Sequence, residues 1–150
     1  MSRFIAAAAT VATLATALPA AAQFQKPEDA VKYRKAAFTV MAAHFGRIGA
    51  MAQGKAPYNA AAAAANAEIV AQMSVLPFAG FVDGTQGSDK GTPKANVWSE
   101  RAKFDAGAKK MQEEVTKLVA AAKTNDEGKL KAAFGAAAGT CKSCHDDFRN

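Results

Sequence analysis

Apolar residues recur at helical spacing through most of the chain, and breaker residues divide them into four segments. In the first segment the apolar side chains of Val31, Phe38, Met41, Phe45 and Ile48 fall three, four or seven residues apart, the spacing of one buried helix face. Alanine, the best helix former, is abundant in all four segments. The pattern predicts an all-α protein. The expected helices span about residues 27–53, 59–76, 96–123 and 126–149.

The links between these segments indicate how the helices are arranged. Pro27 with two following acidic residues marks the start of the first helix, and Asn59 can cap the second. Two links are short, whereas residues 79–96 carry five glycine or proline breakers and form one long polar loop. Short links join antiparallel neighbours, so the sequence predicts an antiparallel four-helix bundle.

The first 22 residues have the composition of an export signal rather than of a folded segment. Met1-Ser2-Arg3 is positively charged, residues 4–18 are apolar apart from threonine, and Ala20-Ala21-Ala22 fits a small-residue cleavage site. A transmembrane helix is the alternative, but spanning needs roughly 20 apolar residues. We therefore predict a cleaved signal peptide at residues 1–22 and one mature domain at residues 23–150, in the periplasm.

Charge and hydropathy exclude several classes of partner. Without Arg3 the chain carries 18 Lys and Arg against 13 Asp and Glu, and both signs are spread along it with no basic block. This pattern argues against nucleic-acid binding. No later segment is apolar for long enough to span a bilayer, so no membrane insertion is expected after cleavage.

The chemistry of the chain is concentrated at Cys141-Lys142-Ser143-Cys144-His145. Two cysteines three apart followed by histidine form the c-type haem attachment pattern. At about 100° per residue, Cys144 and His145 lie about 60° and 40° from Cys141, all on one helix face. The alternatives are a thiol redox pair, which lacks the strand-then-helix context, and a zinc half-site, for which only His44 remains as a further histidine or cysteine ligand. The motif predicts one covalent haem c, with iron ligated by His145.

The sequence resembles the cytochrome c prime family, the class II c-type cytochromes, over essentially the whole mature chain. The resemblance is carried by Lys26 to Arg34, by Leu76 to Ala79, by Val97 to Ser99, and by Lys131 to Gly135 leading into the haem motif. It implies a haem-bearing four-helix bundle, and family members often form homodimers. The C-terminal position of the motif separates this family from other c-type cytochromes.

The resemblance aligns Phe38 with the distal face of the haem, opposite His145. A phenyl ring cannot coordinate iron, and at close range it would crowd an incoming ligand. Ordinary core packing is the other explanation for Phe38. Met41, about 60° from Phe38 on the helix, is the competing candidate, because a thioether is a good sixth ligand; we take it as core.

Four polar residues complete the candidate haem site. Arg34 lies on the apolar stripe and needs an anion, which a haem propionate would supply; a side chain extending to solvent at the bundle end is the alternative. The resemblance gives the same role to Lys35 with less support, and Asp89 is a weak candidate for the haem edge. Arg149, four residues after His145, is expected over the proximal side, although a cation there would also suit the helix dipole.

These residues favour a periplasmic haem protein with five-coordinate, high-spin iron that binds diatomic gases, above all nitric oxide and carbon monoxide. The alternative is a low-spin electron-transfer cytochrome with Met41 as sixth ligand, and a redox partner protein fits either. An enzyme ranks lowest, because no distal histidine, arginine or glutamate is available to move protons.

Overall fold

The computed structural model describes residues 23–150, so the predicted signal peptide at residues 1–22 lies outside the described residues. The elements in chain order are α1 (Pro27–Ala52), α2 (Ala60–Met73), the 3₁₀ helix η2 (Leu76–Gly80), α3 (Asn96–Ser99), α4 (Arg101–Ala122) and α5 (Glu127–Phe148). The predicted all-α four-helix bundle is confirmed.

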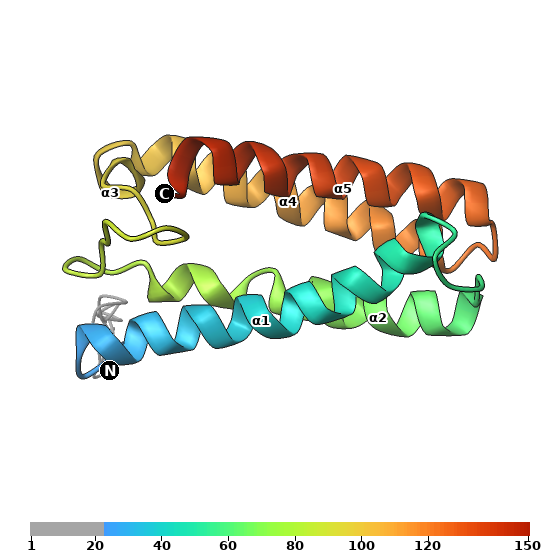
Figure 1. Cartoon of the computed structure of the whole chain (residues 1–150), viewed down its shortest axis with the longest axis horizontal. Coiled ribbons are helices and arrows are strands. Elements are labelled where there is room, and N and C mark those ends of the chain that lie inside the picture. Colours follow the sequence, from blue (N-terminus) through green and yellow to red (C-terminus); the bar gives the residue numbers. More distant parts are fainter. Residues whose placement is uncertain (1–22) are drawn as a thin grey trace, which may run out of the picture.

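The four long helices run antiparallel as two pairs (Figure 1). Helix α1 packs mainly along α2, and α4 packs mainly along α5. The two pairs lie close together at the end where α1 turns into α2, and they diverge toward the end that carries the C-terminus. The long loop between η2 and α3 lies at this diverging end.

Local signals explain where the helices begin. Pro27 occupies the first turn of α1, where its missing N–H is not needed. The side chains of Asn59 and Asp126 cap α2 and α5 by accepting hydrogen bonds from the backbone N–H of Ala62 and Lys129. These two starts agree with the sequence prediction.

Two predicted boundaries were wrong. The second helix ends at Met73 rather than near Leu76, because its last turn tightens at Ser74, whose N–H bonds the carbonyls of both Val70 and Ala71; residues 76–80 form η2 instead, part of it within the predicted loop. The third helix is interrupted at Glu100, whose backbone (φ −113°, ψ 40°) separates the short α3 from α4.

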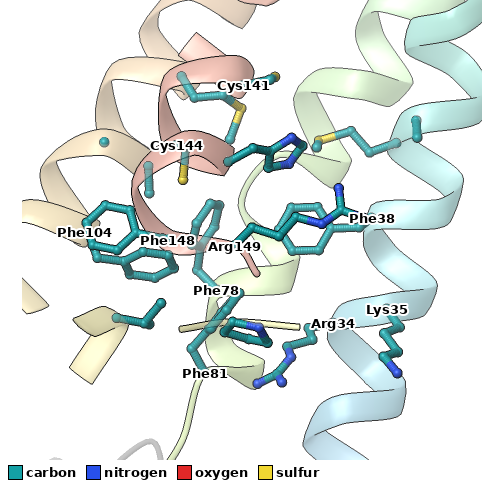
Figure 2. Close-up of a pocket in the computed structure, with 18 of the residues that line it drawn as sticks. Arg34, Lys35, Phe38, Phe78, Phe81, Phe104, Cys141, Cys144, Phe148 and Arg149 are labelled. Atoms are coloured by element: carbon teal, nitrogen blue, oxygen red, sulfur yellow. The ribbon is translucent and has the colours of Figure 1, made fainter. Parts of the chain in front are cut away.

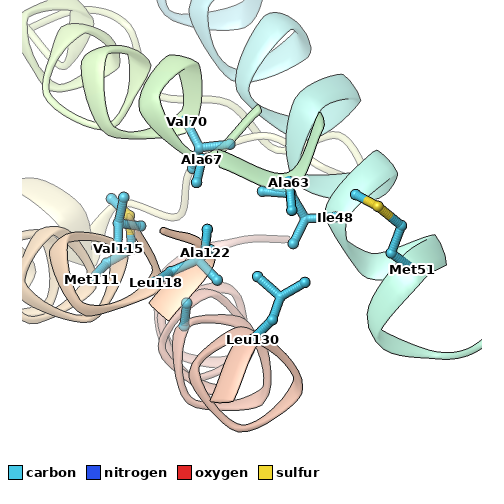
Figure 3. Packing of buried hydrophobic residues seen from close by; sticks show 11 residues of the cluster. Ile48, Met51, Ala63, Ala67, Val70, Met111, Val115, Leu118, Ala122 and Leu130 are labelled. Atoms are coloured by element: carbon cyan, nitrogen blue, oxygen red, sulfur yellow. The ribbon is translucent and has the colours of Figure 1, made fainter. Parts of the chain in front are cut away.

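The core fills the closed end of the bundle and holds the four long helices together. Ile48, Leu118 and Leu130 are fully buried there and meet from α1, α4 and α5 (Figure 3). Small residues of α2, including Ala63 and Ala67, allow that helix to approach closely. In the described range 23–150, none of the helices is both long and apolar enough to cross a membrane.

Candidate functional site

A pocket of about 610 Å³ lies between the two helix pairs. Its wall is formed by side chains of α1, η2, α4 and α5, together with residues 91–93 of the long loop. Figure 2 shows α1 and α5 on opposite sides of this pocket. The volume lies in the range of sites that enclose a small molecule or cofactor.

The wall formed by α5 carries the sequence motif. Cys141, Cys144 and His145 all line the pocket, as the helical spacing predicted. Both cysteines are half-buried free thiols with no disulfide between them. Burial raises the pKa of the Cys141 thiol and that of the Cys144 thiol, so both are protonated near neutral pH. The α5 wall therefore presents two S–H groups and one imidazole to the same space.

His145 has an environment that favours its neutral form. Burial of the ring lowers the pKa of His145, the positive charge of Arg149 lowers it further, and Asp146 partly opposes them. Neutral imidazole is the form that ligates a metal ion. Among residues 23–150, no group of three or more His, Cys, Asp or Glu side chains is placed to hold a metal ion.

Aromatic rings from α1 and η2 form the opposite wall. Phe38 on α1 meets Phe78 and Phe81 edge to face, at centroid distances of 6.1 and 6.3 Å. Phe81 also packs at 4.8 Å on Phe104 of α4, which in turn meets Phe148 of α5 at 5.3 Å. Such pairs favour fixed geometry beyond their buried area. These phenyl rings therefore form one continuous apolar part of the pocket lining (Figure 2).

Sequence reasoning missed part of this aromatic wall. Phe81 lies in the segment predicted to be a polar loop, yet it is buried at 9% exposure. The available signal was the run Phe78-Ala79-Gly80-Phe81, two aromatic residues three apart directly after a predicted helix end. That spacing brings side chains to one side of a 3₁₀ helix.

Arg34 lies on the pocket wall with partners that the sequence did not predict. At 4% exposure, its guanidinium donates to the Gly80 carbonyl at 3.0 Å and to the Thr85 hydroxyl and carbonyl at 2.7 Å each. It also lies over the Phe81 ring, 4.7 Å from the centroid. No ion pair of Arg34 occurs within residues 23–150. Neutral acceptors therefore satisfy three of the five donors of its guanidinium, and the contact between Arg34 and a haem propionate stays a prediction.

The remaining predicted residues divide into those at the pocket and those away from it. Lys35, Met41 and Arg149 line the pocket. Asp89 does not belong to the lining; it is exposed in the loop, where its carbonyl accepts hydrogen bonds from Thr92. His44 also lies away from the pocket, half-buried with its Nδ1 2.8 Å from the Asn66 amide oxygen.

The residues around the pocket fit a covalently attached haem. Two free thiols and one imidazole on a single helix face match the two vinyl groups and the iron of haem, and the phenyl rings suit its apolar face. The side chains of Arg34, Lys35 and Arg149 supply cationic groups at the pocket wall. The fold and the site together define a c-type haem protein built on a four-helix bundle.

Comparison with known proteins identifies the family. A family model described as Cytochrome C' matches residues 29–149. A cytochrome c' of Rubrivivax gelatinosus is 50% identical over 127 residues, which covers 85% of this chain and 98% of that protein. A cytochrome c' of Alcaligenes xylosoxydans xylosoxydans is 47% identical with the same coverage. The chain belongs to the cytochrome c' family, and the predicted cofactor, one covalent haem c, is confirmed.

Solved structures of the family have the same fold. The crystal structure of cytochrome c' from Rubrivivax gelatinosus aligns with a TM-score of 0.80 at 50% identity, over 85% of this chain and all of that chain. A nitric oxide complex of a variant of cytochrome c prime from Alcaligenes xylosoxidans aligns with a TM-score of 0.78 at 46% identity, over 85% of this chain and 98% of that chain.

Proposed function

We propose that this chain is a periplasmic haem protein with five-coordinate, high-spin iron that binds nitric oxide and carbon monoxide, buffers nitric oxide, and can also transfer electrons. The observation that carries the proposal is Phe38, a side chain with no ligating atom on the pocket wall opposite the haem-attachment motif. Bound ferrous haem supplies the open iron coordination position that takes a diatomic gas.

Three residues of α5 hold the cofactor in this proposal. Cys141 and Cys144 would hold the haem through two thioethers, each made by addition of one S–H across one vinyl group, and His145 would ligate the iron. The lowered pKa of His145 favours the neutral imidazole that ligation requires. These groups bind and orient; none is placed to carry out acid–base catalysis, so we propose a carrier rather than an enzyme.

Polar residues at the pocket wall would hold the propionate edge of the haem. Arg34 keeps free N–H groups beyond its three protein partners, since a guanidinium has five donors, and these can bind a propionate. Lys35 and Arg149 are exposed cations on the same lining. Asp89 lies outside the lining, which makes it the least supported of the three predicted edge residues; Arg149 remains the candidate for the proximal side.

The apolar surroundings of Phe38 support binding of nitric oxide and carbon monoxide rather than dioxygen. The neighbours of the Phe38 ring are Phe78 and Phe81, and a phenyl ring offers no N–H or O–H group. Bound dioxygen gains much of its stability from a hydrogen-bond donor, whereas nitric oxide and carbon monoxide need less polar stabilisation. The nitric oxide complex of the Alcaligenes xylosoxidans relative supports the same ligand class.

Met41 sustains a second candidate function. Its side chain lines the same pocket, one helical turn from Phe38, and a thioether ligand would make the protein a low-spin electron carrier. Met41 also packs against the core cluster, which supports a packing role instead.

Replacement of Phe38 by alanine tests the proposed distal role. We expect Phe38→Ala to bind carbon monoxide about tenfold faster or more, equivalent to removing about 1.4 kcal/mol of barrier, because the ring no longer occupies the approach to iron. Stopped-flow mixing of the reduced protein with carbon monoxide measures the rate. Val40→Ala is the matched control, since Val40 is an exposed residue of α1, and its rate should equal that of the wild type.

The same kinetics separate the two candidate functions. Under the proposal, Met41→Leu leaves carbon monoxide binding nearly unchanged. If Met41→Leu accelerates binding strongly while Phe38→Ala does not, methionine is the sixth ligand and the protein is an electron carrier.

Export and assembly complete the proposal. Residues 1–22 act as a cleaved signal peptide, so that the mature protein, residues 23–150, works in the periplasm. The bacterial cytochromes c' to which the chain is similar support this location. The mature protein forms a homodimer, and its partners are the gas ligand and a redox protein.

A further inference from the structure

The last turn of α5 carries His145, and Arg149 is the first residue after the helix. This helix end lacks the glycine that often terminates a helix. Residue Arg149 follows the helix in extended conformation (φ −120°, ψ 131°). A helix end leaves its last carbonyl groups without partners inside the helix. Water, side chains or another segment of the chain can satisfy them.

The loop between η2 and α3, residues 81–95, supplies most of these partners, and we call it the strap. Lys94 of the strap donates from its ammonium group to the carbonyls of Asp146 at 2.9 Å and Asp147 at 3.3 Å. Its backbone N–H donates to the carbonyl of Phe148 at 2.9 Å. The Asn96 amide adds a bond to the Asp147 carbonyl. One lysine thus contacts three consecutive carbonyls, and its charge lies at the negative end of the helix dipole.

Further bonds fasten the strap to the chain end beyond α5. The N–H of Gly91 donates to the Asn150 carbonyl at 2.7 Å, and the N–H of Asn150 donates to the Thr92 carbonyl at 2.9 Å. Pro93 and Arg149 form an antiparallel bridge. Gly91 has φ +85°, and a Cβ atom there would lie 3.1 Å from the Arg149 guanidinium. The positive φ is what favours glycine at this position, and the Arg149 guanidinium packs closely against it.

The other end of the strap is fastened to α1. Thr85 is 3% exposed and accepts two hydrogen bonds from Arg34, at its hydroxyl and at its carbonyl. The Thr85 hydroxyl donates in turn to the Val82 carbonyl at 2.7 Å. The strap therefore connects the α1 wall of the pocket with the last turn of α5.

We propose that Lys94 is a positioning residue for the axial ligand: it holds the last turn of α5, and the strap joins that turn to Arg34 on the facing wall. This inference rests on the proposed role of His145 as iron ligand. The N–H of Arg149 donates to the carbonyl of His145 at 3.1 Å, so loosening the turn loosens the backbone of His145 directly. The sequence motif alone contains no signal for this contact, because Lys94 lies about 50 residues before it.

Substitution of Lys94 in the full haem-loaded protein tests the proposal. We expect Lys94→Met to accelerate hydrogen exchange of the Arg149 amide about tenfold, the factor that one charge-assisted hydrogen bond provides. Lys90→Met is the matched control, since Lys90 is an exposed lysine of the same strap that does not line the pocket, and its exchange should match the wild type. Lys94→Arg should restore slow exchange, because arginine keeps the charge and the donors.

The iron–imidazole bond provides a second measurement. It should not change if Lys94 only caps the end of α5 and has no effect on the position of His145. In the reduced protein, resonance Raman spectroscopy should show that the iron–imidazole stretching band is shifted or broadened in Lys94→Met and unchanged in Lys90→Met. Faster exchange with an unchanged band would overturn the positioning role. If the wild type has no such band, five-coordinate iron in the proposed function fails, and the exchange comparison then decides whether Lys94 holds the turn.

Thr85→Val tests the connection to the facing wall. Valine keeps the shape of threonine but removes the hydroxyl that bonds Arg34. We expect faster exchange of the Lys94 amide, which donates to the Phe148 carbonyl at the other end of the strap. Acceleration confined to residues 82–86 would show that the strap does not connect the two walls.

Discussion

The double substitution Cys141→Ala with Cys144→Ala is expected to eliminate covalent haem completely. Each thioether forms when one S–H adds across one vinyl group, and these are the only two cysteines of the chain. Both are free thiols on the pocket wall. Haem staining after denaturing electrophoresis, together with the mass of the intact chain, measures the loss.

Control variants separate attachment from folding. Ser143→Ala changes an exposed residue inside the motif and should retain full haem staining. Each single cysteine variant should keep at most one thioether. Haem that survives denaturation in the double variant would contradict the assignment of these cysteines.

Gly80→Ala is expected to destabilise the fold by about 2–3 kcal/mol, the usual cost of forcing atoms into a packed site. A Cβ atom at this position would lie 2.6 Å from the Ala30 carbonyl oxygen and 2.8 Å from the Arg34 Cβ. Both neighbours belong to α1, so the 3₁₀ helix would have to move away from that helix. The Gly80 carbonyl would move with it and weaken its bond from Arg34. Chemical denaturation of the haem-loaded protein measures the change in free energy of unfolding.

Gly135→Ala is the matched control. Gly135 lies inside α5, is exposed, and has open space where a Cβ atom would be added. Alanine there should stabilise the protein by about 0.5–1 kcal/mol, because glycine weakens a helix interior. Equal effects of the two substitutions would contradict the close approach of η2 to α1.

The fold could be predicted because its signals are local. The apolar stripe of α1 and the capping residues Asn59 and Asp126 act within one or two turns. The haem-attachment face of α5 follows from helical spacing alone. The long loop was also identified from its glycines and prolines. Helix ends are less sharply signalled: Pro77 set the predicted end of the second helix near Leu76, whereas the chain already leaves the α-helix at Ser74.

The rest of the site depends on contacts between distant segments, which periodicity cannot reveal. The partners of Arg34 lie 46 and 51 residues away, and a glycine carbonyl gives no sign in the sequence that it will accept a bond. Phe81 is buried because η2 packs on α1, although its neighbours in the sequence indicate a loop. Nothing in the sequence around Lys94 indicates that its side chain bonds the carbonyls of Asp146 and Asp147, more than 50 residues away.

The absorption spectrum of the reduced protein, recorded with and without carbon monoxide, tests the central claim most directly. Five-coordinate high-spin iron, with His145 on one side and Phe38 opposite, predicts one broad ferrous band and ready formation of the carbon monoxide complex. Sharp low-spin bands in the reduced protein, with carbon monoxide binding poorly, would contradict the account and assign a sixth ligand to a side chain such as Met41.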